Sequence, residues 1–231
     1  MSTFVRCCTI TLAGFFALPA LAKPLPIPKL AWHAASQITT TPASSVSVTL
    51  THMSGAPIPV RAVYEKGLDP ANDRSVDMVT YATTEAYPSG TQFKMAVQTA
   101  ELTYLYVINS DDLNRTTRLF PAKQGSEMGS PMVAAQSILT LPGDSRSFTL
   151  SQQPGNVYVL VLMTDKALDV EAFVAKLRAA PGDFKKKVFT LLGSDLIAPT
   201  SLRYDPTQAT SAVVGTSRGS IVPVLLAVGH R

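Results

Sequence analysis

The strongest hydrophobic pattern lies between residues 102 and 163, where short apolar runs alternate with polar turns. The stretch Thr103–Asn109 predicts a strand that is apolar on both faces. Its alternate positions are Tyr104, Tyr106 and Ile108 on one face, and Leu105 and Val107 on the other. Val157–Met163 is a continuous apolar run of strand length. Such strands are typical of the inside of a sandwich, or of a sheet covered by helices.

The same alternation predicts further strands along the chain. They are Val46–Leu50, Ile58–Tyr64, Met78–Ala82, Phe93–Val97, Thr116–Phe120, Ser137–Leu141, Arg146–Ser151, Ala212–Val214 and Ile221–Val228. Pro-Gly turns join the central strands without intervening helices, which indicates antiparallel pairing. The first two strands are expected to form a hairpin. Pro223 indicates an edge position or a bulge for the last strand, because proline has no backbone donor. Residues 122–136 are expected to form a long loop.

Two helices are predicted after residue 167, where the period of the apolar positions changes. Asp169 caps a helix with apolar residues at helical spacing, and Ala180-Pro181-Gly182 ends it. Asp183 caps a second helix that Gly193 closes. The lysines at 185–187 are expected to form a solvated face. The predicted fold is therefore mainly β: an antiparallel β-sandwich-like domain with a short two-helix insertion at 167–193, in the α+β class.

The first 22 residues have the pattern of a cleavable secretory signal peptide. Arg6 supplies the positive start, Cys7–Leu21 is apolar, and Ala20-Leu21-Ala22 is a small-residue cleavage site. The apolar run is shorter than the roughly 20 residues of a membrane span. We therefore expect export to the periplasm or the medium, with no integral membrane segment after cleavage. Residues 23–44 are expected to be a linker rich in Pro, Ser and Thr, and residues 45–231 a single β-rich domain.

Composition excludes some function classes for the mature chain. Both cysteines lie in the predicted signal peptide, so disulfides, thiol catalysis and cysteine metal sites are not expected. Loss of Arg6 reduces 20 basic residues to 19 against 16 acidic ones, a net charge of +3. The basic residues are scattered and form no basic stripe, so nucleic acid is not expected as a partner. Trp32, the one tryptophan, is expected to anchor the linker to the fold, with a partner contact as the alternative.

Several short motifs in the central stretch resemble a known bacterial family. In order they are Tyr104-Leu105-Tyr106-Val107-Ile108-Asn109, Arg118-Leu119-Phe120-Pro121, Leu141-Pro142, Phe148 and Pro154-Gly155. Their order and spacing are similar to those of the family called domain of unknown function 4384, over roughly residues 85–165. The chain has Asp111-Asp112-Leu113-Asn114 where the family often has Asp-Gly, which predicts a longer hairpin loop. The resemblance implies a β-rich accessory module of bacterial envelope and multidomain proteins, and no established reaction.

No motif in the chain predicts catalysis or a metal site. Gly215-Thr216-Ser217-Arg218-Gly219 fits G-x-S-x-G, but a strand is predicted after it where a nucleophile elbow needs a helix. His33, His52 and His230 share no metal-ligand spacing. The oxygen-rich turn from Asn109 to Asn114 lacks the order of a calcium loop. We expect no catalytic residue, no cofactor and no bound metal.

The sequence therefore favours an exported, non-catalytic interaction module that binds a protein or an envelope component. Two alternatives stay open: a hydrolase of unrecognised type, using a carboxylate pair or Ser217, and a structural subunit of a surface or secretion assembly. Candidate partner contacts flank the tip of the central hairpin, because loop tips carry function more often than strands. They are Asp111, Asp112, Arg115 and Arg118.

Overall fold

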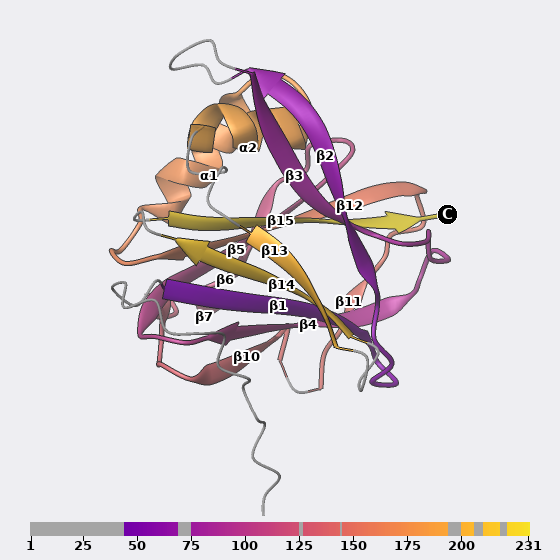
Figure 1. Ribbon diagram of the computed structural model, residues 1–231, viewed down its shortest axis with the longest axis horizontal. Helices are drawn as coiled ribbons and strands as arrows, with labels where there is room; N and C mark the ends of the chain where they lie inside the picture. Colours follow the sequence, from indigo (N-terminus) through magenta and orange to yellow (C-terminus); the bar gives the residue numbers. More distant parts are fainter. Residues whose placement is uncertain are drawn as a thin grey trace, which may run out of the picture. The chain divides into compact units, whose positions relative to one another are not determined.

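Two β-sheets face each other, and two helices cover the outer face of one of them (Figure 1). The computed structural model describes residues 44–68, 75–124, 127–143, 145–193, 200–205, 210–217 and 221–231. The predicted signal peptide, the linker up to residue 43 and Trp32 lie outside these residues. The mainly β fold with two helices near the C-terminus confirms the predicted fold class.

The first sheet has the strand order β10-β4-β1-β14-β13, and β11 pairs with β4 beside β10. Its strands are β1 (Ser44–His52), β4 (Gln92–Thr99), β10 (Ser137–Leu141), β11 (Phe148–Thr149), β13 (Thr200–Asp205) and β14 (Thr210–Ser217). All these pairings are antiparallel. Since β10 and β11 pair with successive parts of β4, together they form one interrupted edge of this sheet.

The second sheet has the order β2-β3-β15-β12-β5-β6, and β9 pairs with β5 beside β6. Its strands are β2 (Val60–Leu68), β3 (Ser75–Thr83), β5 (Thr103–Asp111), β6 (Thr117–Phe120), β9 (Met132–Val133), β12 (Gly155–Thr164) and β15 (Ile221–His230). The pairing of β3 with β15 is parallel, and the others are antiparallel. A bulge interrupts the β5–β6 register between Val107 and Ile108.

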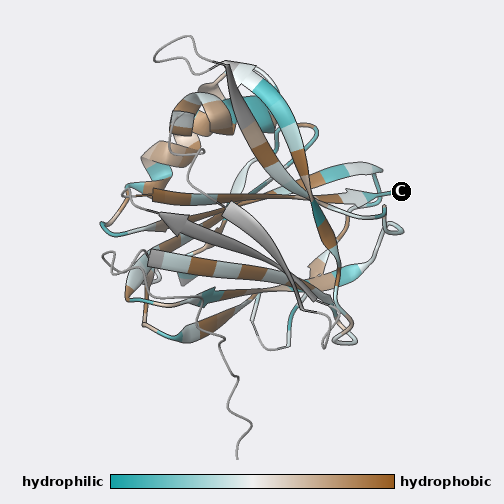
Figure 2. Ribbon diagram, in the orientation of Figure 1, coloured by the Kyte–Doolittle hydropathy of each residue, from teal (hydrophilic) through white to brown (hydrophobic). Residues whose placement is uncertain are grey.

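The main core lies between the two sheets. One face of β1 supplies Val46, Val48 and Leu50, and every second residue of β4 from Phe93 to Val97 joins them. Apolar positions alternate with polar ones along β1 (Figure 2), as expected for a strand with one face toward the core and one away from it. Leu105 and Val107 enter this core from the second sheet.

A second core lies between the second sheet and the helices α1 (Val170–Ala179) and α2 (Phe184–Leu192). The strands supply Tyr106, Ile108, Tyr158, Leu160, Leu162, Leu225 and Ala227; the helices supply Val170, Val174, Leu177, Phe184, Val188 and Leu192. The sheet is therefore apolar on both faces, as predicted for its two central strands. The Tyr106 hydroxyl accepts a hydrogen bond of 2.8 Å from the Leu168 backbone, which ties the approach to α1 to this face.

The helix boundaries follow the predicted caps. The Asp169 carboxylate accepts from the Ala172 N–H at 3.0 Å, and the Asp183 carboxylate accepts from the Lys186 N–H at 2.9 Å. Each bond satisfies one backbone donor that the first turn leaves free. Gly193 follows α2 with φ +49, a left-handed value that glycine adopts readily.

The lysines at 185–187 do not form one solvated face. Lys185 makes an ion pair with Glu65 of β2, and its side chain is 23% exposed. Lys187 is buried, and the Lys186 side chain is 72% exposed. The expectation holds for Lys186 alone, because α2 lies against the second sheet and turns the neighbouring lysines toward it.

The predicted hairpin of the first two strands is wrong. The segment after β1 turns back far enough for the Ile58 N–H to donate to the Leu50 carbonyl at 2.9 Å, but β2 then joins the other sheet and pairs with β3. Strand β1 pairs instead with β4 and β14. Local alternation predicted the strands correctly, whereas their partners are set by contacts between distant parts of the chain.

The structure differs from the sequence prediction at three other places. Strand β15 lies between β12 and β3, so it is not an edge strand. Pro223 lies opposite Leu162 of β12, but β3 pairs only with Leu226 and Ala227. On the side toward β3, no strand pairing requires a backbone donor at Pro223, so the proline is tolerated there. Strand β13 was not predicted. Residues 122–136, expected to be an unstructured loop, contain the short strands β7 (Lys123–Gln124), β8 (Glu127–Met128) and β9.

Within the part of the chain that the structure describes, neither helix is long and apolar enough to cross a membrane.

Replacing Leu162 by Ala should lower the free energy of unfolding by about 2–5 kcal/mol, because Leu162 is fully buried under the helices and its loss leaves a cavity. Urea unfolding followed by circular dichroism measures this change. The matched control is Ile138→Ala on β10, where the side chain is 64% exposed and the expected change is within about 0.5 kcal/mol. Equal losses in the two variants would contradict the helix-covered sheet.

Candidate functional site

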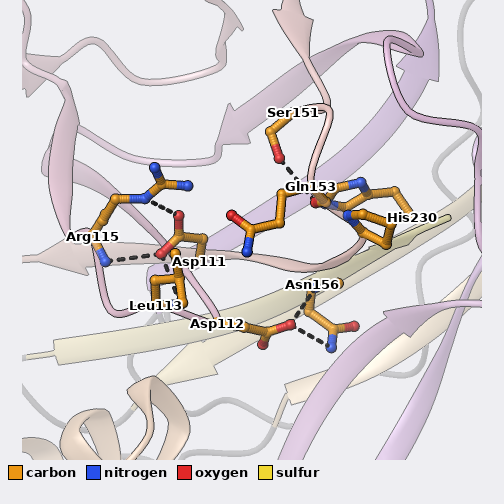
Figure 3. A pocket seen from close by; sticks show the side chains of 10 residues that line it. Asp111, Asp112, Leu113, Arg115, Ser151, Gln153, Asn156 and His230 are labelled. Atoms are coloured by element: carbon orange, nitrogen blue, oxygen red, sulfur yellow. Dashed lines mark hydrogen bonds and ion pairs between the residues drawn. The ribbon is translucent and has the colours of Figure 1, made fainter.

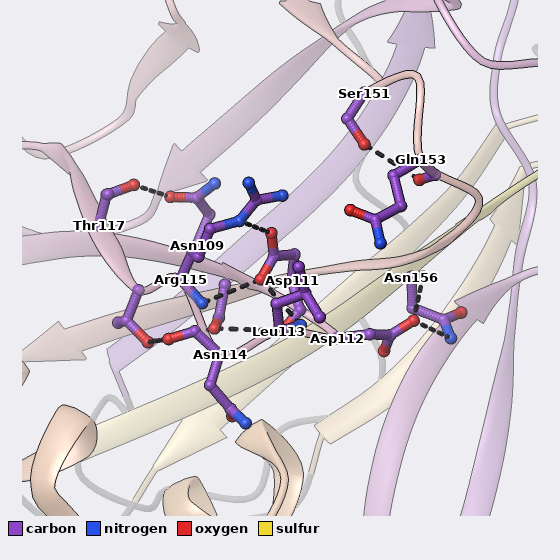
Figure 4. Close-up of polar contacts among 12 residues, drawn as sticks. Asn109, Asp111, Asp112, Leu113, Asn114, Arg115, Thr117, Ser151, Gln153 and Asn156 are labelled. Carbon is purple, nitrogen blue, oxygen red and sulfur yellow. Dashed lines mark hydrogen bonds and ion pairs between the residues drawn. The ribbon is translucent and has the colours of Figure 1, made fainter.

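The tip of the β5–β6 hairpin is held by Asp111, the last residue of β5 (Figure 4). Its carboxylate accepts backbone hydrogen bonds from Leu113 at 3.0 Å and from Arg115 at 2.9 Å. The Arg115 guanidinium donates to the second carboxylate oxygen through Nε at 2.5 Å. Partial burial opposes ionisation of Asp111, but these bonds and the charge of Arg115 outweigh it and lower the pKa of the carboxyl group. These bonds to Asp111 thus hold the loop of residues 112–116 in a defined conformation.

Asp112 joins this tip to the start of β12. Its Oδ2 accepts from the Asn156 backbone N–H at 2.7 Å. The approach is close because residue 155 is glycine: a Cβ there would lie 2.5 Å from Asp112 Oδ2. Gly155 also has φ +147, a conformation that other residues rarely adopt. The Pro-Gly turn before β12 therefore provides the space in which Asp112 binds.

The Arg118 side chain is nearly buried and bonds to other parts of the fold. Its side chain is 7% exposed, Nε donates to the Pro121 carbonyl at 2.8 Å, and the guanidinium pairs with Glu171 of α1. Arg178 of α1 donates to the Thr116 carbonyl at 2.7 Å. Both arginines tie the hairpin to the first helix. Of the four predicted contact residues, Asp111, Asp112 and Arg115 gather at the hairpin tip, whereas Arg118 is engaged toward the helix.

A hollow of about 180 Å³ opens beside this tip, between the edges of the two sheets. We call it the edge hollow. It is lined by residues of β4, β5, the β5–β6 loop, β6, β11, the segment after β11, and β12: Phe93, Asn109, Asp111, Arg115, Leu119, Phe148, Thr149, Leu150, Ser151, Val157 and Val159. Strand β11 has only two residues and β6 only four, so neither sheet edge extends far enough to cover the space between them.

The base of the edge hollow is apolar and its rim is polar. Phe93, Leu150 and Val159 at the base are each at most 3% exposed. Phe148 packs on Phe93 with ring centroids 5.4 Å apart and is partly exposed. The rim residues Thr149 and Ser151 are exposed, as is Arg115, whose side chain is 63% exposed. Ligand sites commonly combine an apolar base with a few polar groups at the mouth.

A smaller polar recess of about 40 Å³ adjoins the edge hollow and shares Asp111, Arg115 and Ser151 with it (Figure 3). It is also lined by Asp112, Leu113, Gln153, Pro154, Gly155, Asn156 and His230. His230 is 6% exposed, and its buried Nδ1 has no hydrogen-bond partner. Among the described residues, Ser151 Oγ donates to the Gln153 carbonyl at 3.1 Å and forms no bond with His230. The recess thus holds a serine and a histidine that are not coupled for proton transfer.

The other chemical candidates from the sequence lie elsewhere. Ser217 is the last residue of β14, and β15 begins at Ile221, so the strand–turn–helix context of a nucleophile elbow is not formed there. No group of three metal-capable side chains gathers within the described residues. In the oxygen-rich turn, the Asp111 carboxylate accepts from Leu113 and Arg115, and Asp112 accepts from Asn156. Asn114 Oδ1 is buried and has no hydrogen-bond partner among the described residues.

Comparison with known families confirms the resemblance drawn from the central motifs. A family model described as a domain of unknown function, DUF4384, matches residues 86–167, from before β4 to just after β12. No curated protein matches the chain. No solved structure matches it either.

Every residue that lines the edge hollow falls within this matching segment, from Phe93 to Val159. The sequence singled out Asp111 and Arg115 as candidate contacts of the hairpin tip, because turn residues stand out from the strands around them; the structure places both at the rim of the hollow. Sequence reasoning missed the apolar base. Along the chain, Phe93, Leu150 and Val159 have the alternating pattern of ordinary core residues, and only the spacing of the sheet edges shows that they face a space.

Replacing Gly155 by Ala should displace Asp112 and lower the free energy of unfolding by about 1–3 kcal/mol. Gly55→Ala is the matched control, because Gly55 also has positive φ but no atom lies within 4 Å of the added Cβ. Chemical denaturation of both variants should show the larger loss at Gly155, and the Asn156 amide resonance should shift only in that variant. An unshifted Asn156 amide in Gly155→Ala would contradict the Asp112 bond.

Burial, followed by the negative charge of Asp112 and a hydrogen bond to it, raises the pKa of Tyr158 to about 12. The folded state therefore holds this proton more tightly than the unfolded chain, whose tyrosine has a pKa of about 10. Stability from this group is complete below pH 10 and should be lost as the pH rises from 10 to 12. Denaturation across this range, compared with Tyr158→Phe, should show the steeper decline in the unchanged protein. Parallel declines would contradict the raised pKa.

Proposed function

We propose that the protein is an exported, non-catalytic binding module that holds an apolar group of a protein or envelope component in the edge hollow. The observation that carries the proposal is the hollow itself. It has an apolar base made by both sheets, a polar rim at the hairpin tip, and a lining drawn wholly from the segment that matches the family. A space with these properties supports binding more directly than any single side chain does.

Binding rather than catalysis is supported by how the polar groups are used. The Asp111 carboxylate accepts from Leu113 and Arg115, and Asp112 accepts from Asn156. A catalytic base needs its carboxylate free to receive a proton from substrate, and the lowered pKa of Asp111 makes it a weaker base. These groups instead shape and stiffen the rim.

The exported location is supported by the sequence of the first 22 residues: the basic Arg6, the apolar Cys7–Leu21 and the small residues Ala20-Leu21-Ala22. Export would bring the module to the periplasm or the medium, where an envelope component is available as a partner.

The test is affinity capture from an envelope extract with three forms of the protein. Val157→Phe places a ring at the hollow, since Val157 lines it and is only partly buried. Ile138→Ala alters an exposed apolar side chain on β10, outside the hollow. We expect the unchanged protein and Ile138→Ala to retain the same partner and Val157→Phe to recover at least tenfold less, as quantified by mass spectrometry.

Circular dichroism and thermal unfolding confirm beforehand that Val157→Phe is folded. If that variant unfolds, Leu119→Phe takes its place, because Leu119 also lines the hollow and is partly exposed. Equal recovery by the folded hollow-filling variant and the unchanged protein would overturn the proposal.

A further inference from the structure

The size of the edge hollow indicates the kind of apolar group that it can hold. Its volume is about 180 Å³. An engineered apolar cavity of about 150 Å³ in another protein takes up benzene, so one aromatic ring fits a space of this size. The tilted Phe93–Phe148 ring pair forms part of the wall of the hollow. A further ring beside this pair gains the edge or offset contacts that aromatic side chains prefer.

Two acceptor groups at the rim of the hollow, the side chains of Asn109 and Asp111, are already bonded within the fold, whereas two donor groups remain. The side-chain Oδ1 of Asn109 accepts from Thr117 Oγ1, and the Asp111 carboxylate accepts from Leu113 and Arg115. Arg115 uses Nε for Asp111, which leaves the terminal nitrogens of its guanidinium at the exposed rim (Figure 4). Asn109 also lines the hollow, and its side-chain amide nitrogen is a second donor. A ligand that pairs with these two donors must therefore supply hydrogen-bond acceptors.

The charge of the rim separates the two common kinds of acceptor. Asp111 and Arg115 at the rim carry one charge each, and Asp112 in the adjoining recess adds a second negative charge close by. A carboxylate ligand would gain the Arg115 donors but would be repelled by the excess negative charge. A neutral carbonyl accepts the same hydrogen bonds without that repulsion. The rim therefore favours carbonyl groups, which every extended peptide carries along its backbone.

We propose that the edge hollow binds an aromatic side chain from within an extended peptide segment of a partner protein. The ring enters between the two sheet edges, and main-chain carbonyls beside it accept hydrogen bonds from Arg115 and Asn109. This inference rests on the proposed binding function and adds the chemistry of the partner. The partner residue lies inside its chain, because a terminal carboxylate would meet the negative charge of Asp111 and Asp112.

Three small probes test this assignment by nuclear magnetic resonance titration of the folded protein. N-acetyl-phenylalaninamide has the ring and neutral carbonyls, N-acetyl-phenylalanine has the ring and a carboxylate, and N-acetyl-alaninamide lacks the ring. We expect the first to bind with a dissociation constant on the order of 1 mM, as its size allows. The backbone amides of Thr149 and Val157 should shift. The carboxylate should bind severalfold more weakly, and the alanine probe should cause no shift at these amides.

Two variants assign the groups. Val157→Phe should abolish the shifts caused by the phenylalaninamide, since it fills the hollow. Arg115→Ala should weaken binding of the same probe by roughly tenfold through loss of a charged donor, and Arg115→Lys should restore part of it. Ile138→Ala should bind as the unchanged protein does. Tighter binding of the carboxylate, equal binding of the alanine probe, or shifts away from the hollow would overturn the inference.

The two experiments fail in distinguishable ways. A partner whose capture depends on the hollow, combined with no binding of the phenylalaninamide, would leave the proposed function standing and remove the aromatic assignment. Binding of the phenylalaninamide in the hollow, combined with capture that does not depend on Val157, would remove the proposed partner function.

Discussion

The structure depends on the burial of the second sheet from both sides. Strand β12 is buried at every position from Tyr158 to Thr164. A strand with one solvent-exposed face would be exposed at every second position. The first sheet covers one face and the two helices cover the other. The caps at Asp169 and Asp183, the Tyr106 hydroxyl bond and the two arginines that reach between α1 and the hairpin all keep the helices on that outer face.

The edge hollow follows from how the sheets end. A sandwich closes well in its middle, where β1, β4, β5 and β12 present regular apolar rows. At the side formed by β6 and β11, the edge strands are short and the β5–β6 register is bulged. The apolar rows continue past the point where the edges can cover them. Apolar surface is therefore left facing a space, and the hairpin tip, which Asp111 holds in shape, stands at its entrance.

The elements that the sequence predicted best are those governed by neighbouring residues. These elements are specified by a few adjacent residues. Examples are the two-faced pattern of Thr103–Asn109, the apolar run up to Met163 and the aspartate caps of both helices. Strand β13 was missed because Thr200–Asp205 is largely polar and carries little alternation. The partners of β1 and β2, the parallel pairing of β15 with β3, and the hollow could not be predicted. They arise where segments far apart in the sequence meet.

The order of strands in the second sheet has a consequence for how the chain is assembled during synthesis. Strand β15 is the last of these strands to leave the ribosome, yet it is the one that joins β3 to β12. Among the described strands, the pair β2–β3 and the group β5, β6 and β12 thus have no strand pairing between them until residues 221–230 are made. The sheet can therefore be completed only after residues 221–230 have been made, and the long loop that its closure forms is of the kind that slows folding.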